Sequence, residues 1–148
     1  MTAPFIMLVD DEVSFVEITA KRLVKRNIKT ITAFSAEEGL ENLKKNQDLD
    51  VIILDIKMPG MGGIDALKEI KTASPLVEVI MLTGHATIEL AIDALKLGAL
   101  DFLMKPVDIE KLVLKIQEAA DRKQQQEEKI QKAHKEETLA KYGPFYYT

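Results

Sequence analysis

Four short apolar runs in this chain each lead directly into polar residues, which are Asp10 and Asp11, Asp55, Thr83 and Lys105. Short apolar runs separated by longer amphipathic stretches are typical of the buried strands of a parallel sheet. In such sheets, ligands bind beyond the carboxyl ends of the strands. We therefore expect these side chains to converge at one edge, where three carboxylates, one hydroxyl and one ammonium are suited to hold a divalent cation and a phosphoryl group.

Size, charge and cysteine content limit the class of protein. A chain of 148 residues with 47% hydrophobic content is long enough for one domain and an appendage. The net charge of -4 and the lack of any run near the ~20 apolar residues of a membrane span argue against direct binding to nucleic acid or membrane. The chain has no cysteine, so disulfides and thiol chemistry are excluded. The Met1–Pro4 segment lacks the features of a secretion signal, and we expect a cytoplasmic protein.

The spacing of apolar residues predicts five strands that alternate with five helices. Short runs predict strands over residues 5–9, 28–33, 51–54, 77–83 and 100–104, and all of them except 28–33 are mainly apolar. Apolar positions three or four apart predict helices over residues 13–26, from 35 to the polar stretch 46–48, over 64–73 and 86–97, and from 108 onward. This alternation indicates a doubly wound α/β fold with right-handed crossovers. With the flavodoxin-like strand order 2-1-3-4-5, the four strands that precede the polar residues are neighbours.

Capping residues support several of these helix boundaries. Ser35 precedes Glu38 by three residues, as in a capping box, and Asp108 is suited to cap the last helix. Gly98 stands where a glycine commonly ends a helix. The loop 58–63 contains one proline and three glycines, so we expect unusual backbone dihedrals or close approaches there.

The C-terminal part of the chain differs in composition from the rest. Residues 121–141 are rich in Lys, Gln and Glu, and their charges nearly cancel. We expect a solvated, partly frayed continuation of the last helix, which does not continue past Gly143–Pro144. We therefore divide the chain into a domain over residues 1–123 and a helical extension or linker with a short tail over 124–148. An interrupted heptad pattern leaves a coiled-coil dimer as an alternative for the extension.

The polar residues and two loop motifs together resemble the receiver domain of the response regulators of bacterial two-component systems, a family that includes the chemotaxis regulator. The resemblance covers roughly residues 4–121. The residues that carry it are Asp10–Asp11, Asp55 with Met58–Pro59–Gly60, Thr83 and Lys105–Pro106. Their order and spacing make this match far more specific than any single motif.

The resemblance implies a metal-dependent phosphorylation site. Asp55 would be the phosphoryl acceptor, and Asp10, Asp11, Asp55 and the backbone carbonyl of Lys57 would hold Mg²⁺ directly or through water. Oxygen ligands with retained waters suit Mg²⁺, and also Mn²⁺. Three carboxylates opposite one lysine carry excess negative charge, which we expect to raise the pKa of at least one carboxyl group.

The resemblance also assigns roles on the other side of the site. Thr83 would hydrogen-bond one phosphoryl oxygen, Lys105 would pair with another, and the Lys105–Pro106 bond would be cis. Phe102 lies where the family has its rotating aromatic switch residue, although an aromatic residue on a strand is also common in a core. Two positions differ from the common family pattern. Gly62 stands where the family commonly has an acidic residue, and His85 where side chains affect water access to the phosphoryl group.

These observations favour a signalling protein. In this hypothesis a sensor histidine kinase or a phosphotransfer protein phosphorylates Asp55, and Thr83 and Phe102 then change the surface formed by the fourth helix, the fifth strand and the fifth helix. That surface would bind an effector, an output domain absent from this sequence, or a second copy of the chain. The protein would catalyse only its own aspartyl phosphorylation and dephosphorylation.

Two other classes of function remain open at this point. A Mg²⁺-dependent phosphohydrolase with an aspartate nucleophile also uses an α/β sheet, but such enzymes resemble one another in a D-x-D pair, whereas Lys57 lies two residues after Asp55. A docking module that acts without phosphorylation would keep only the receiver shape. The partner kinase, the output and the lifetime of a phosphorylated state are not encoded in any recognisable pattern.

Overall fold

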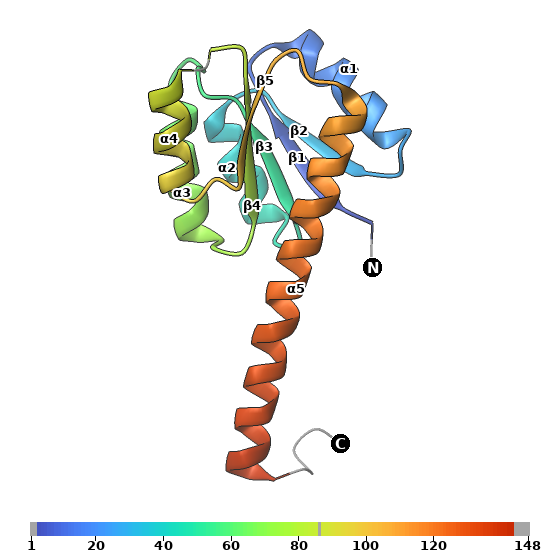
Figure 1. Ribbon diagram of the computed structural model, residues 1–148, viewed down its shortest axis with the longest axis vertical. Coiled ribbons are helices and arrows are strands. Elements are labelled where there is room, and N and C mark those ends of the chain that lie inside the picture. The colour runs from blue at the N-terminus through green and yellow to red at the C-terminus, as the bar shows by residue number, and fades with distance from the viewer. Residues whose placement is uncertain (1–2, 86, 144–148) are drawn as a thin grey trace.

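The computed structural model describes residues 3–85 and 87–143 of the chain. Five strands alternate with five helices along the sequence (Figure 1). The elements are β1 (Phe5–Val9), α1 (Val13–Val24), β2 (Lys29–Ala33), α2 (Ala36–Lys45), β3 (Val51–Leu54), α3 (Gly63–Ala73), β4 (Glu78–Thr83), α4 (Ile88–Lys96), β5 (Asp101–Met104) and α5 (Ile109–Tyr142). All strand pairs are parallel, and the sheet order is β2-β1-β3-β4-β5. The predicted flavodoxin-like α/β fold is confirmed.

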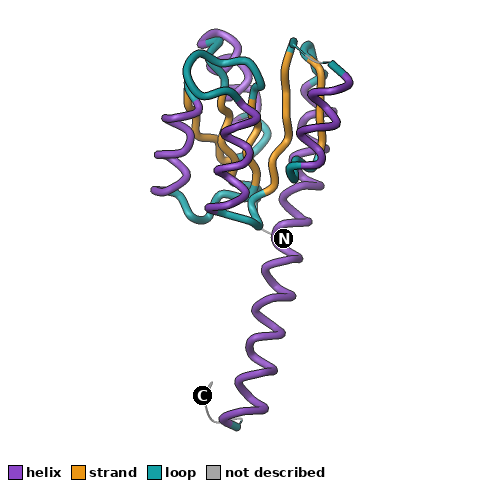
Figure 2. Tube along the Cα trace, turned by 90° about the vertical axis from the view of Figure 1, so that its left-hand side faces the viewer, coloured by secondary structure: helices purple, strands orange, loops and turns teal. Residues whose placement is uncertain are grey.

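The three central strands β1, β3 and β4 are buried on both faces, which explains why they are almost entirely apolar. Along β1, Ile6 and Leu8 face one hydrophobic cluster while Met7 and Val9 face the other. The first cluster contains buried residues of α1 and α5, and the second contains buried residues of α2, α3 and α4. Figure 2 shows the resulting three layers edge-on, with helices on both sides of the strands. Side chains alternate between faces along a strand, so each central strand contributes to both clusters.

The predicted helix caps are present. The Ser35 hydroxyl accepts a hydrogen bond from the Glu38 N–H at 3.1 Å, and the Asp108 carboxylate accepts one from the Lys111 N–H at 3.2 Å. Gly98 follows α4 with a φ of +105°, a conformation that favours glycine. The predicted start of α4 at Ala86 lies outside the described residues, and the helix begins at Ile88.

Several predicted boundaries are wrong by one or two residues because turn residues decide them. The first helix ends at Val24 and not at 26, since Asn27 adopts a φ of +65° and turns the chain into β2. At the start of β4, the Val77 N–H donates to the Ser74 carbonyl in a turn, so the strand begins at Glu78. Strands β2 and β5 likewise begin one residue later than predicted, and α3 begins one residue earlier.

Helix α5 continues well beyond the sheet as a single helix. It projects from the body of the molecule in Figure 1, and every residue from 128 to 137 is exposed. The predicted helical continuation is therefore present and runs uninterrupted up to Tyr142, and its fraying stays a prediction. Residues 144–148 lie outside the described part. The boundary at residue 123 falls inside this helix and stays a prediction. Among the described residues, no helix is long and apolar enough to span a membrane.

Candidate functional site

The site lies at the carboxyl edge of the sheet, where the ends of four neighbouring strands meet. Asp10 follows β1, Asp55 follows β3, Thr83 ends β4 and Lys105 follows β5. The strand register places the ends of β1 and β3 level, because Val9 pairs with Leu54, and the ends of β4 and β5 level, because Thr83 pairs with Met104. The convergence predicted from the apolar runs is therefore present for all four strands.

Three carboxylates form the centre of the site. One oxygen each from Asp10, Asp11 and Asp55 lie within 4.8 Å of one another. Asp10 and Asp55 are buried, with 1% and 3% of their surface exposed, whereas Asp11 is exposed. Asp55 Oδ1 accepts a hydrogen bond from the Ile56 N–H at 2.9 Å, and Asp10 Oδ1 accepts one from the Glu12 N–H at 2.9 Å. Each buried aspartate thus keeps its second oxygen for another partner.

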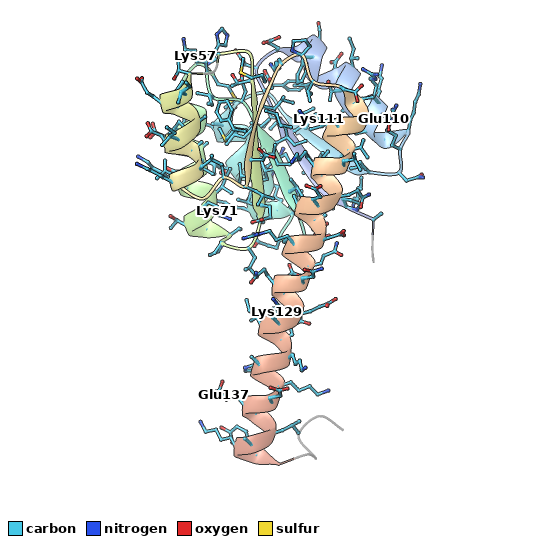
Figure 3. The ribbon with its side chains drawn as sticks, in the orientation of Figure 1. Lys57, Lys71, Glu110, Lys111, Lys129 and Glu137 are labelled. Atoms are coloured by element: carbon cyan, nitrogen blue, oxygen red, sulfur yellow. The ribbon has the colours of Figure 1, made fainter. Side chains whose placement is uncertain are left out.

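The loop after β3 packs tightly against Asp55. The Gly63 N–H donates to the Ile56 carbonyl at 2.7 Å. A Cβ atom on Gly63 would lie 2.0 Å from the Asp55 carbonyl oxygen, so only glycine fits there. Lys57 is exposed and lies at the carboxyl end of the sheet, near the top of the molecule in Figure 3. The close approach fixes the backbone that carries Asp55.

The ammonium of Lys105 is held by the segment that follows β1. Its Nζ lies 2.6 Å from Asp10 Oδ2, 3.2 Å from Glu12 Oε1 and 4.2 Å from the centre of the Phe15 ring. The Lys105–Pro106 bond is cis, as the resemblance implies. The sequence did not predict the contacts with Glu12 and Phe15, because Phe15 matches the apolar face of its helix and Glu12 follows no recognisable pattern.

The charges at this site affect one another. Burial raises the pKa of Asp10, and the nearby Asp55 carboxylate adds to this effect, while hydrogen bonds from Lys105 and the Glu12 N–H oppose it. The predicted rise is therefore present, although burial and not repulsion is its main cause. For Lys105, burial lowers the pKa, but its contacts with Asp10 and Glu12 outweigh burial and raise it. The Asp10 carboxylate and the Lys105 ammonium thus each stabilise the charged form of the other.

Thr83 and Phe102 lie on the same side of the sheet. Thr83 is fully buried, and its Oγ1 accepts a hydrogen bond from the His85 N–H at 3.1 Å. Phe102 is half-buried and packs against the cluster covered by α2, α3 and α4. Its ladder partner is Met81, two positions before Thr83, so Met81 and Thr83 project from the same face. Packing in the core and a switch role both fit this position of Phe102.

The carboxylates suit a divalent metal ion. Oxygen-only ligands, two of them buried and one facing solvent, match the preferences of Mg²⁺ and Mn²⁺, which retain several waters. The Lys105 ammonium, which lies 2.6 Å from Asp10 Oδ2, shows that the cluster of carboxylates attracts a positive charge. The acidic cluster is thus able to bind a cation.

Comparison with known proteins agrees with this geometry. Residues 6–117 match the family model described as the response regulator receiver domain. The chain belongs to this family. It is a receiver domain, a signalling module found in response regulators, and the resemblance noted from the sequence is confirmed.

Related proteins place the receiver domain in longer and shorter chains. The transcriptional regulatory protein ZraR of Klebsiella oxytoca is 38% identical over 114 residues, which make up 77% of this chain and 26% of that protein. This chain thus spans about a quarter of the length of the curated relatives it matches. A CheY-like receiver domain protein from Methanospirillum hungatei JF-1 has 30% identity and a TM-score of 0.79, over 84% of this chain and 99% of that one.

A further similar structure is a CheX–CheY–BeF3–Mg²⁺ complex from Borrelia burgdorferi. It has 30% identity and a TM-score of 0.72, over 76% of this chain and 86% of that chain.

Proposed function

We propose that Asp55 accepts a phosphoryl group in a Mg²⁺-dependent reaction, from a phosphohistidine on a sensor kinase or a phosphotransfer protein. The observation that supports this most directly is the burial of Asp55 beside Asp10 and Asp11, with a lysine ammonium bound to the same cluster. Since Asp55 Oδ1 accepts the Ile56 N–H, Oδ2 is the oxygen left to attack phosphorus. The P–N bond of the donor breaks as the new P–O bond forms, and the imidazole leaves with a proton from solvent.

The remaining polar groups would stabilise the phosphoryl oxygens. Asp10, Asp11, Asp55 and the Lys57 carbonyl would hold Mg²⁺, which neutralises charge on the phosphoryl group when it is bound. The Thr83 hydroxyl accepts the His85 N–H in the resting structure, so its own proton is available for donation to a phosphoryl oxygen. The Borrelia burgdorferi complex contains BeF3 and Mg²⁺, and beryllofluoride bound to a carboxylate mimics an acyl phosphate.

Phosphorylation would change the contacts of the surface formed by α4, β5 and α5. The change would pass through Thr83 and Phe102 to this surface. It carries large exposed apolar side chains, including Ile88, which is 80% exposed, and Met104. Exposed apolar groups that lie together are common at protein interfaces. We propose that an effector, an output domain or a second receiver binds here.

The output itself would lie outside the receiver. ZraR is a transcriptional regulatory protein that is much longer than the matched region. By analogy, we propose that residues 124–148 link this receiver to an output domain or effector in the cytoplasm. The support for this linker role of residues 124–148 is the greater length of ZraR.

The test is the intact mass after incubation with acetyl phosphate, with and without Mg²⁺. We expect one Mg²⁺-dependent phosphoryl adduct in the wild type and in Asp65→Asn, whose aspartate is exposed in α3, and none in Asp55→Asn. An adduct that persists in Asp55→Asn would refute the assignment of the acceptor. No adduct on folded, Mg²⁺-binding wild type would favour a docking module, and steady release of phosphate from small esters would favour a phosphohydrolase.

A further inference from the structure

We propose that Glu12 and Phe15 are positioning residues that hold the Lys105 ammonium on the Asp10 side of the site until Asp55 is phosphorylated. In this inference the lysine has a resting position, set by these two residues, and a working position on the phosphoryl group. The resting position follows from contacts in the structure. The working position rests on the proposed function.

Three groups define the resting position from different directions. The Nζ atom lies 2.6 Å from Asp10 Oδ2, 3.2 Å from Glu12 Oε1 and 4.2 Å above the Phe15 ring. All three belong to residues 10–15, the short segment that leaves β1 and begins α1. The Lys105 and Asp10 side chains are only 12% and 2% exposed, so their ion pair is largely shielded from water, whereas the Glu12 side chain is 60% exposed. Shielding strengthens the ion pair between Lys105 and Asp10.

The segment also fixes its own geometry. The Glu12 N–H donates to Asp10 Oδ1, which turns Asp10 Oδ2 toward the lysine. Phe15 is half-buried and packs against the core cluster that contains α1 and α5, so its ring is held in place. The lysine thus meets a prearranged acceptor, a second carboxylate and a fixed aromatic face.

The resting position competes with the working one. Among the described residues, no ion pair within 4.0 Å joins Lys105 to Asp55, although the two groups are close enough to interact electrostatically. To pair with a phosphoryl oxygen on Asp55, the ammonium has to give up contacts in the segment 10–15. Each contact that stabilises the resting position therefore lowers the equilibrium population of the phosphorylated-state position of Lys105 by the factor by which it favours the resting one. For a partly exposed cation–π contact this factor is about two- to fivefold.

The first experiment observes the resting position directly. In protein with ¹³C-labelled lysine, the ε-methylene signal of Lys105 is assigned by its loss in Lys105→Arg. The ring current of Phe15 should shift this signal upfield. Phe15→Leu keeps an apolar side chain and removes the ring, while Phe34→Leu is the matched control, since Phe34 is also half-buried against the same core cluster. We expect the upfield shift in the wild type and in Phe34→Leu but not in Phe15→Leu, and its absence from the wild type would overturn the inference.

The second experiment observes the movement. Mg²⁺ and beryllofluoride are added, and ¹⁹F signals report the bound anion. We expect the Lys105 signal to return to its ordinary position as bound beryllofluoride appears, and Phe15→Leu to bind beryllofluoride about two- to fivefold more tightly than Phe34→Leu. A Lys105 signal that stays upfield with the anion bound, or equal affinities in the two variants, would refute the competition. Failure to bind beryllofluoride at all would refute the proposed function, while the first experiment still decides the resting position.

Discussion

Replacing Lys123 by methionine should destabilise the protein, because Lys123 anchors α5 to the amino end of the sheet. Its Nζ lies 3.2 Å from Asp50 Oδ1 and also pairs with Glu127. The Lys123 and Asp50 side chains are only 6% and 8% exposed. Asp50 precedes β3, and its Oδ2 accepts the Phe5 N–H at 2.9 Å. One buried carboxylate thus connects β1, β3 and α5.

The expected loss follows from the burial of the pair. Removing one partner of a buried ion pair leaves an uncompensated charge and costs about 3–5 kcal/mol. Asp50 keeps its hydrogen bond from the Phe5 N–H, so we expect a value near the lower limit, about 3 kcal/mol. Domains of this kind have stabilities of about 5–15 kcal/mol, so the variant should still fold.

Urea unfolding followed by circular dichroism measures this loss. Lys44→Met is the control, because Lys44 pairs with Glu41 on the surface with 75% and 63% of the two side chains exposed, and it should change nothing measurable. The double variant Lys123→Met with Asp50→Asn should recover part of the loss, since it removes the unpaired charge. A Lys123→Met variant within about 0.5 kcal/mol of the wild type would refute the reasoning, because that is the scatter of ordinary surface changes.

The pH dependence gives an independent check on the same pair. Burial lowers the pKa of Lys123, but its contacts with Glu127 and Asp50 outweigh burial and raise it above 10.5. A folded-state pKa above the unfolded value adds stability that is complete below pH 10.5 and is lost as the pH rises through the folded pKa. The difference in stability between the wild type and Lys123→Met should therefore shrink above pH 10.5.

Three further predictions concern other parts of the receiver. Gly63→Ala should lose about 3 kcal/mol in urea unfolding, because its Cβ would lie 2.0 Å from the Asp55 carbonyl oxygen, whereas Gly62→Ala, at 3.5 Å from its nearest neighbour, should lose little. Thr87→Ala should lose about 1 kcal/mol, since the Thr87 hydroxyl caps α4; an unchanged urea midpoint would contradict this. Mg²⁺ at 100 times its Kd should raise the free energy of unfolding of the wild type by about 2.7 kcal/mol, measured by thermal unfolding. The same Mg²⁺ concentration should stabilise Asp11→Asn much less, and an equal gain in both proteins would argue against a metal site at Asp11.

The fold was predictable because it depends on patterns that the sequence carries locally. A strand buried on both faces, such as Val51–Leu54, needs apolar residues at every position, and this run is distinct from the amphipathic helices around it. Parallel strands bring their carboxyl ends to one edge, so the convergence of Asp10, Asp55 and Lys105 followed from the order of the elements. Element boundaries were less predictable, since single residues such as Asn27 decide them through their backbone conformation.

The side-chain partners were not predictable in the same way. Lys105 contacts Glu12 and Phe15 because the turn after β1 brings these residues to the end of β5. The two residues lie 93 and 90 positions before Lys105 in the chain, and no local pattern encodes these contacts. Lys123 was grouped with the solvated Lys-Gln-Glu stretch, and this was wrong for that residue. It is buried because α5 passes over the start of the sheet, where Asp50 is available as a partner. The missed contacts of Lys105 and the error for Lys123 have the same cause. The composition of a segment describes its average environment, whereas tertiary packing determines the environment of each side chain.

Lys105 and Lys123 lie at opposite ends of the sheet. Lys105 lies at the acidic cluster shortly before α5 begins, and Lys123 holds the same helix at the amino end of the sheet, where Arg122 Nε also lies 3.0 Å from Glu78 Oε2. Beyond this anchor the helix continues to Tyr142, a length of about 29 Å at 1.5 Å per residue. The helix is uninterrupted across this anchor, so any tilt of α5 would also move the extension. A tilt of about 5° would move the far end by about 2–3 Å over that length.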